Sequence, residues 1–256
     1  QLQKDYVQAG TNILYAPTFT ANRIKLAEYH LENNMSAMIH DLVAVSKEAA
    51  ASTPGHPVYV AGDITMTGEQ LKPMGKMELE TLIDIYKEQI LCLVDAGADL
   101  LVVETMMSLA ETRAALIAAK EVCDLPVIAT LTFEADGRTL FGTDAKTAAI
   151  VLESLGASAI GANCSTGPAQ MESIISDMVS HTGIPVIAKP NAGLPFLDEN
   201  GITCYNMEAE EFTEEMEVLV NAGATILGGC CGTTPEFIRQ IHDRFGTEAK
   251  VTAARR

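Results

Sequence analysis

The sequence has little positive charge, few aromatic residues and no long apolar run, and each shortage excludes a class of function. It has 17 Lys and Arg against 34 Asp and Glu, whereas nucleic acids and anionic membranes are bound by clustered Lys and Arg. No apolar run approaches the roughly 18 residues of a membrane span, and residues 1–10 are too polar for a signal peptide. Trp is absent and aromatic residues make up 5% of the chain, which disfavours an aromatic cage for a quaternary ammonium ligand. The sequence predicts a soluble, cytoplasmic protein that binds neither nucleic acid nor a membrane.

The six cysteines do not form the dense pattern of a secreted disulfide framework. Cys92 and Cys123 lie in helical patterns, where a cysteine is usually a small buried hydrophobic residue. Cys204 lies in a polar stretch and is assigned no role. The other three come shortly before a proline that begins a predicted helix: Cys164, Cys230 and Cys231.

The chain repeats a unit in which an amphipathic helix is followed by a short apolar run. In four copies a glycine caps the helix, and in three the run begins after a proline. The predicted strands are 13–16, 58–62, 100–103, 127–132, 159–163, 186–190 and 225–229, and the predicted helices are 24–50, 77–95, 109–121, 144–155, 168–180, 207–221 and 235–244. The runs are continuously apolar, as in strands buried on both faces. The alternation predicts an α/β fold with a parallel sheet covered by helices, either open and doubly wound or closed as a (β/α)₈ TIM-type barrel.

The predicted units are interpreted as one domain over residues 1–256. Leu2, Tyr6 and Val7 lead directly to the helix end at Gly10, with no strand before them. Seven units are visible, one fewer than a closed barrel contains. We therefore expect the first βα unit, a strand and its loop, to lie upstream of Gln1.

In a parallel architecture the ligand site lies at the carboxyl ends of the strands. Glycines beside the double cysteine allow a sharp turn, and the following helix N-terminus favours thiolate over thiol. A double cysteine so placed is either a metal site or a redox pair. Three thiolates from separate strand ends suit a tetrahedral zinc ion with one open position, and cysteines without metal are the alternative. The residues at predicted strand ends include Asp63, Glu104, Thr105, Cys164, Asn191, Cys230 and Cys231.

Three motifs at these strand ends carry a family resemblance. They are Gly161-Ala162-Asn163-Cys164-Ser165, Lys189-Pro190-Asn191-Ala192-Gly193 and Gly228-Gly229-Cys230-Cys231-Gly232-Thr233-Thr234-Pro235. With them the chain resembles the homocysteine S-methyltransferase family and, more narrowly, the homocysteine-binding domains of cobalamin-dependent methionine synthases. The resemblance extends over nearly the whole chain.

The resemblance implies a (β/α)₈ barrel that binds zinc through Cys164, Cys230 and Cys231, with the sulfur of homocysteine in the fourth position. It also implies that Asn191 can hold that position when substrate is absent. Glu104 matches the catalytic-site carboxylate that receives the substrate ammonium group.

Thr105 and Asp63 are expected to contribute to the same substrate site, with Asp63 orienting either a loop or the substrate amine. The implied reaction gives methionine and uses a methyl-corrinoid donor. Because no corrinoid-binding motif is visible, cobalamin is expected on a separate domain or protein.

Three other functions remain open on the sequence alone. One is homocysteine methylation with a sulfonium or betaine donor. Another is a different barrel enzyme for a pterin or phosphate ligand, although a phosphate cup after the last strands would be glycine-rich without cysteines. The third is a non-catalytic module that binds homocysteine or zinc.

Overall fold

The chain folds around one sheet of seven parallel strands. The structure, a computed structural model, describes residues 1–246. Across the sheet the strands follow the order β1-β2-β3-β4-β5-β6-β9, and each pairs in parallel with the next. They are β1 (Ile13–Tyr15), β2 (Tyr59–Ile64), β3 (Leu100–Met106), β4 (Val127–Leu131), β5 (Ala159–Asn163), β6 (Val186–Lys189) and β9 (Ile226–Leu227). Every residue of β4 and β5 is buried, which is why these runs are apolar without alternation.

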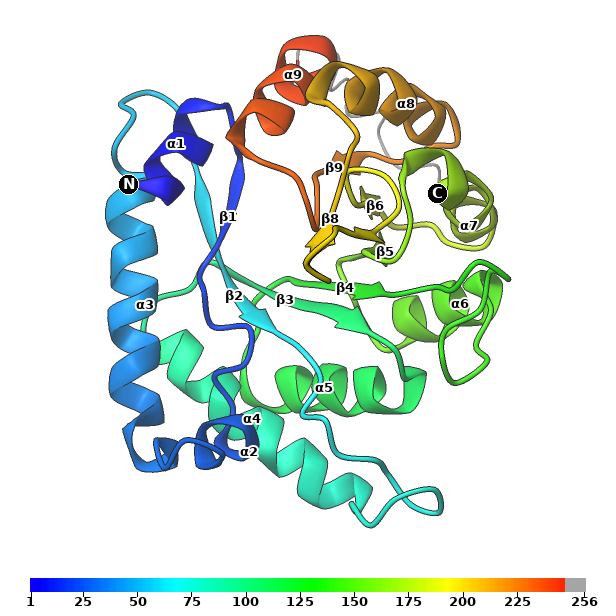
Figure 1. Ribbon diagram of the computed structural model, residues 1–256. Helices are drawn as coiled ribbons and strands as arrows, with labels where there is room; N and C mark the ends of the chain where they lie inside the picture. The colour runs from blue at the N-terminus through cyan, green and yellow to red at the C-terminus, as the bar shows by residue number, and fades with distance from the viewer. Residues whose placement is uncertain (247–256) are drawn as a thin grey trace.

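Helices connect the strands and cover the outer face of the sheet (Figure 1). They are α1 (Leu2–Gln8), α2 (Arg23–Ala27), α3 (Met35–Ala50), α4 (Leu79–Asp95), α5 (Leu109–Val122), α6 (Ala145–Ser154), α7 (Pro168–Ser180), α8 (Ala209–Asn221) and α9 (Pro235–Phe245). The main hydrophobic core lies between these helices and the strands. Within residues 1–246, no helix has both the length and the apolar character needed to cross a bilayer.

The sheet is curled, so that its other face encloses a second, smaller core. Side chains from all seven strands meet there: Ile13 and Tyr15, Ala61, Leu100 and Val102, Ile128, Ala159, Ile187, and Ile226. In a doubly wound sheet helices would cover this face, whereas here the strands pack against one another across it. The predicted barrel-type fold is therefore confirmed, and the doubly wound alternative is wrong.

The two edges of the described sheet are β1 and β9, and the segments beside them are in contact. The Tyr6 hydroxyl of α1 donates a hydrogen bond to the Thr233 carbonyl oxygen ahead of α9, at 3.4 Å. Gly10 has a positive φ of 97°, and a Cβ there would lie 2.4 Å from Cγ of His242. The glycine at the end of the first unit therefore both turns the chain and lets α9 approach.

The predicted helix over 24–50 is wrong in its first half. The structure has α2, then a 3-10 helix η1 (Glu32–Asn34), then α3. His30 between α2 and η1 has a φ of 59°, a left-handed conformation that no α-helix interior contains. Asn22 caps α2 by accepting a hydrogen bond from the Lys25 backbone N–H at 3.0 Å.

The connections after β6 and β9 also differ from the prediction. The last strand is shorter than 225–229, since β9 covers only Ile226–Leu227, and the two glycines that follow it lie close to other side chains. A Cβ on Gly228 would lie 3.0 Å from Cγ of Lys189, and one on Gly229 would lie 2.5 Å from Cγ2 of Thr233. The stretch after β6 contains an unpredicted antiparallel hairpin of β7 (Phe196–Leu197) and β8 (Thr203–Cys204).

Candidate metal centre

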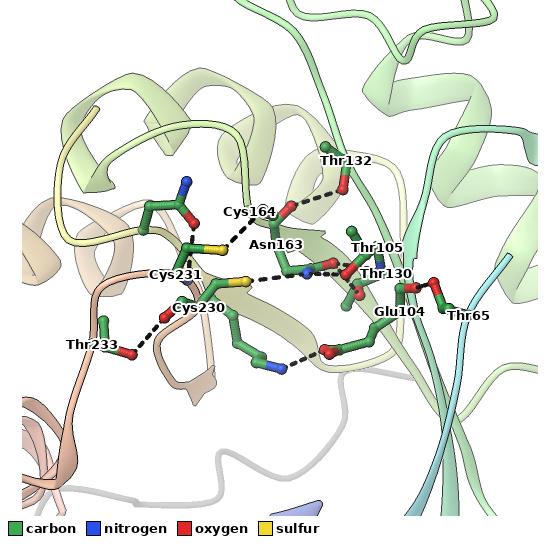
Figure 2. Close-up of polar contacts among 12 residues, drawn as sticks. Thr65, Glu104, Thr105, Thr130, Thr132, Asn163, Cys164, Cys230, Cys231 and Thr233 are labelled. Atoms are coloured by element: carbon green, nitrogen blue, oxygen red, sulfur yellow. Dashed lines mark hydrogen bonds and ion pairs between the residues drawn. The ribbon is translucent and has the colours of Figure 1, made fainter. Parts of the chain in front are cut away.

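Three cysteine sulfurs meet at the carboxyl-terminal mouth of the barrel (Figure 2). Cys164 follows β5, while Cys230 and Cys231 follow β9. The three sulfurs lie within 4.8 Å of one another, and those of Cys164 and Cys231 are 3.8 Å apart. In a tetrahedral site with Zn–S bonds of about 2.3 Å, neighbouring sulfurs are about 3.8 Å apart. Within residues 1–246, no other group of three or more His, Cys, Asp and Glu side chains converges in this way.

The backbone around Cys164 is turned sharply to present its sulfur. Cys164 and Ser165 have φ values of 66° and 59°, which are uncommon for residues other than glycine. The Cys164 N–H donates to the Lys189 carbonyl at 3.1 Å, and the Thr166 N–H donates to the Cys164 carbonyl at 2.7 Å. These bonds hold the strained turn in place.

The double cysteine is tied to the chain that follows β6. The Cys230 N–H donates to the Pro190 carbonyl, and the Ala192 N–H donates to the Cys231 carbonyl, both at 2.9 Å. The Thr233 hydroxyl donates to the Cys230 carbonyl at 2.7 Å. These bonds fix the double-cysteine turn against the chain that follows β6.

The Asn191 side chain contacts the backbone of the double cysteine. It is buried, and its Oδ1 accepts a hydrogen bond from the Cys231 N–H at 3.1 Å. The amide therefore supports the double-cysteine turn. Its service as a fourth metal ligand stays a prediction.

Hydrogen bonds among the three thiols shift their pKa values in different directions. The pKa of Cys164 is lowered, chiefly by a hydrogen bond with the Cys230 thiol, although burial opposes this shift. The same bond raises the pKa of Cys230 to about 11, and a hydrogen bond with Cys230 also raises the pKa of Cys231. One thiolate is thus stabilised by its neighbours, whereas three thiolates require a positive charge between them. The donor set fits zinc in both spacing and chemistry.

The predicted substrate residues Glu104 and Asp63 belong to a buried charged cluster in the barrel. The Lys189 ammonium group, at the end of β6, forms an ion pair with Glu104 and lies 3.9 Å from the centroid of the Tyr15 ring. Burial lowers the pKa of Lys189, but the ion pair and hydrogen bond with Glu104 raise it, and the net shift is upward. Burial raises the pKa of Tyr15 to about 12, against the effect of Lys189. Lys189 is therefore charged at neutral pH and Tyr15 is neutral.

Sequence reasoning missed Lys189 as a site residue. It belongs to one of the three family motifs and directly precedes Pro190 and Asn191, on the strand between the two cysteine loops. Its position at the end of a predicted strand is the signal that could have identified it. Glu104 and Thr105, expected just after a strand, lie within β3.

Asp63 is expected to make the protein less stable as the pH rises. Burial, and then Glu104, raises its pKa well above the usual carboxyl range, and among residues 1–246 its Oδ1 has no hydrogen-bond partner. Such a carboxyl binds more protons in the folded protein, so the free energy of unfolding declines from the unfolded-state pKa up to the raised one. Urea unfolding of the metal-free protein from about pH 4 to about pH 8 should show this decline, and Asp63→Asn should reduce it. An identical pH dependence in both proteins would contradict the assignment.

Comparison with known proteins identifies relatives over almost the whole chain. Residues 1–245 match the family model described as homocysteine S-methyltransferase. Methionine synthase from Mycobacterium leprae (strain TN) is 32% identical over 248 residues, covering 94% of this chain and 20% of that protein. Methionine synthase from Mycobacterium tuberculosis (strain ATCC 25618 / H37Rv) is also 32% identical, over 94% of this chain and 21% of that protein. The chain spans about a fifth of the length of the curated relatives it matches.

Solved structures share the same fold. The homocysteine methyltransferase MmuM from Escherichia coli in its metallated form superposes with a TM-score of 0.78 at 21% identity, covering 95% of this chain and 83% of that chain. The oxidized form of the same enzyme gives a TM-score of 0.78 at 22% identity, over 95% and 82%.

Proposed function

We propose a function from one premise: the chain belongs to the homocysteine S-methyltransferase family. It transfers a methyl group to the thiol of homocysteine, giving methionine, and it holds zinc through Cys164, Cys230 and Cys231. The observation that carries the proposal is the convergence of these three sulfurs within 4.8 Å. We also propose that residues 1–256 form a single domain, although 247–256 lie outside the described residues.

The residues around the site have distinct tasks. When bound, zinc holds the substrate sulfur as a thiolate at neutral pH, the form that attacks a methyl group. Asn191 and the bonds from the chain after β6 keep the double cysteine in place. Thr105 directly follows Glu104 on β3, and Asp63 lies on the neighbouring strand β2, close enough for Glu104 to raise its pKa.

The charged cluster suits the ammonium group of an amino acid. The carboxyl groups of Glu104 and Asp63 face the single positive charge of Lys189. The ion pair with Lys189 orients the Glu104 carboxylate, whose other oxygen can accept a hydrogen bond from a second ammonium group. We assign the substrate ammonium group to Glu104, with Asp63 nearby.

The proposed methyl donor is a methyl-corrinoid carried by a separate domain or protein. The two methionine synthases compared above are about five times as long as this chain. The lack of Trp is a further argument against betaine, because a quaternary ammonium donor is usually held in an aromatic cage. Free thiols that serve as metal ligands need a reducing compartment, so we propose the cytoplasm.

Zinc analysis and a comparison of donors test the proposal together. Purified protein is assayed for zinc and for methionine formation from homocysteine with methylcobalamin, S-methylmethionine or betaine. We expect zinc in the protein and the fastest methyl transfer from methylcobalamin. Faster transfer from S-methylmethionine would contradict the proposed methyl-corrinoid donor. Zinc binding without any methyl transfer would favour the non-catalytic binding module instead.

Glu104→Gln is expected to weaken homocysteine binding while zinc stays in place. The substitution removes a charge-assisted hydrogen bond to the substrate ammonium group, a loss of about 1.5–3 kcal/mol. The dissociation constant, measured by calorimetry, should rise about 10-fold or more, with zinc content as the control. An unchanged dissociation constant would rule out this role for Glu104.

A further inference from the structure

The side-chain amide of Asn163, the last residue of β5, makes hydrogen bonds through both its oxygen and its nitrogen. It is fully buried. Its Oδ1 accepts hydrogen bonds from the Thr105 N–H at 2.9 Å and the Thr130 hydroxyl at 2.7 Å. Its Nδ2 donates to Oγ1 of Thr105 at 2.8 Å and to Sγ of Cys230 at 3.7 Å (Figure 2). Both acceptor sites and both hydrogens of the amide are therefore occupied.

The orientation of this amide follows from its partners. A backbone N–H can only donate, so the side of Asn163 that faces the Thr105 N–H must be its oxygen. The nitrogen then faces Thr105 Oγ1 and the sulfur of Cys230. A flipped amide would set two donors against each other at Thr105, and so the N–H directed at the sulfur is fixed by the network.

The backbone of Thr105 is strained where it contacts the Asn163 amide. Thr105 has a φ of 57°, an unfavourable conformation for a β-branched residue. In that conformation its N–H and its hydroxyl both contact the amide of Asn163. Thr105 directly follows Glu104, so the network joins the substrate end of the site to a cysteine sulfur.

We propose that Asn163 is a positioning residue for Cys230: the hydrogen bond from its Nδ2 to the Cys230 sulfur orients that sulfur as a metal ligand. The inference rests on the proposed function, because it assumes that Cys230 binds zinc. Residues that hydrogen-bond to a metal ligand orient it, and their mutation typically lowers metal affinity 10–100-fold. Asn163 does not touch the substrate position in this assignment; it acts through Cys230.

The test compares Asn163→Asp with Thr132→Val. Aspartate has nearly the shape of asparagine but offers oxygen in place of the N–H that faces the sulfur. Thr132 donates to the backbone carbonyl of Asn163 at 3.1 Å, so Thr132→Val perturbs the same residue without removing that donor. Zinc affinity is measured by competition with a chromogenic chelator, and the sulfur-to-cobalt charge-transfer band is recorded on Co²⁺-loaded protein. We expect Asn163→Asp to lower zinc affinity about 10–100-fold and shift the band, and Thr132→Val to leave both close to the parent.

The outcomes separate this inference from the proposed function. A parent protein that binds no zinc would overturn the proposed function. A parent that binds zinc, with Asn163→Asp matching it in affinity and in the cobalt band, would overturn only the role of Asn163. If Asn163→Asp does not fold, Thr130→Val tests the same role, because it removes the hydrogen bond from the Thr130 hydroxyl to Oδ1 of Asn163. This variant should shift the cobalt band and lower zinc affinity to a smaller extent. An unchanged band in folded Thr130→Val would then reject the role.

Discussion

Replacing any one of Cys164, Cys230 and Cys231 with alanine is expected to abolish stable zinc binding and methyl transfer. The three sulfurs converge within 4.8 Å, and a site with three protein ligands loses a third of its donors in each variant. The parent is expected to hold about one zinc per chain. Atomic absorption on the purified proteins measures the loss, and methionine formation is assayed on the same samples.

Cys92 and Cys123 provide matched controls for this experiment. Both are free cysteines that pack against the main core, away from the barrel mouth. Cys92→Ala and Cys123→Ala should therefore retain the zinc content of the parent. Equal zinc in the parent and in any variant of the three mouth cysteines would contradict the assignment of that residue.

The sheet could be predicted from the sequence because a buried parallel strand has a distinctive pattern. Gly97 and Gly156 end helices with positive φ values, and each is followed within a few residues by an apolar strand, β3 or β5. The convergence of the cysteines followed from the same pattern, since the carboxyl ends of parallel strands meet at one face. What could not be predicted is the break at His30, because it depends on a single left-handed residue in an otherwise helical pattern.

The hydrogen bonds within the site could not be predicted in the same way. Asn163 and Lys189 are directly paired between β5 and β6, yet the amide contacts Cys230 while the ammonium group reaches Glu104. Which strand-end side chain faces which neighbour depends on the register and the curl of the sheet. A shift of one residue in the register of a strand would turn its side chains to the opposite face. The sequence motif contained these residues without indicating their partners.

Lys189→Met is expected to destabilise the protein by about 3–5 kcal/mol, because it leaves a buried carboxylate without its partner. Lys189 and Glu104 form an ion pair in which each side chain is 11% exposed, and Asp63 brings a second carboxyl group close by. The cation–π contact with Tyr15 is lost as well. Urea unfolding of the metal-free protein at neutral pH measures the change in the free energy of unfolding.

A double variant and a surface variant show whether the unpaired charge is the cause. Lys189→Met combined with Glu104→Gln removes both charges of the pair and should recover much of the lost stability, since replacing both partners is far less harmful than removing one. Lys4→Met removes the lysine of an exposed pair with Glu48, whose side chains are 37% and 72% exposed, and should change stability by less than about 1 kcal/mol. If the double variant is as unstable as Lys189→Met alone, the loss comes from packing of the lysine stem against the barrel rather than from the carboxylate of Glu104.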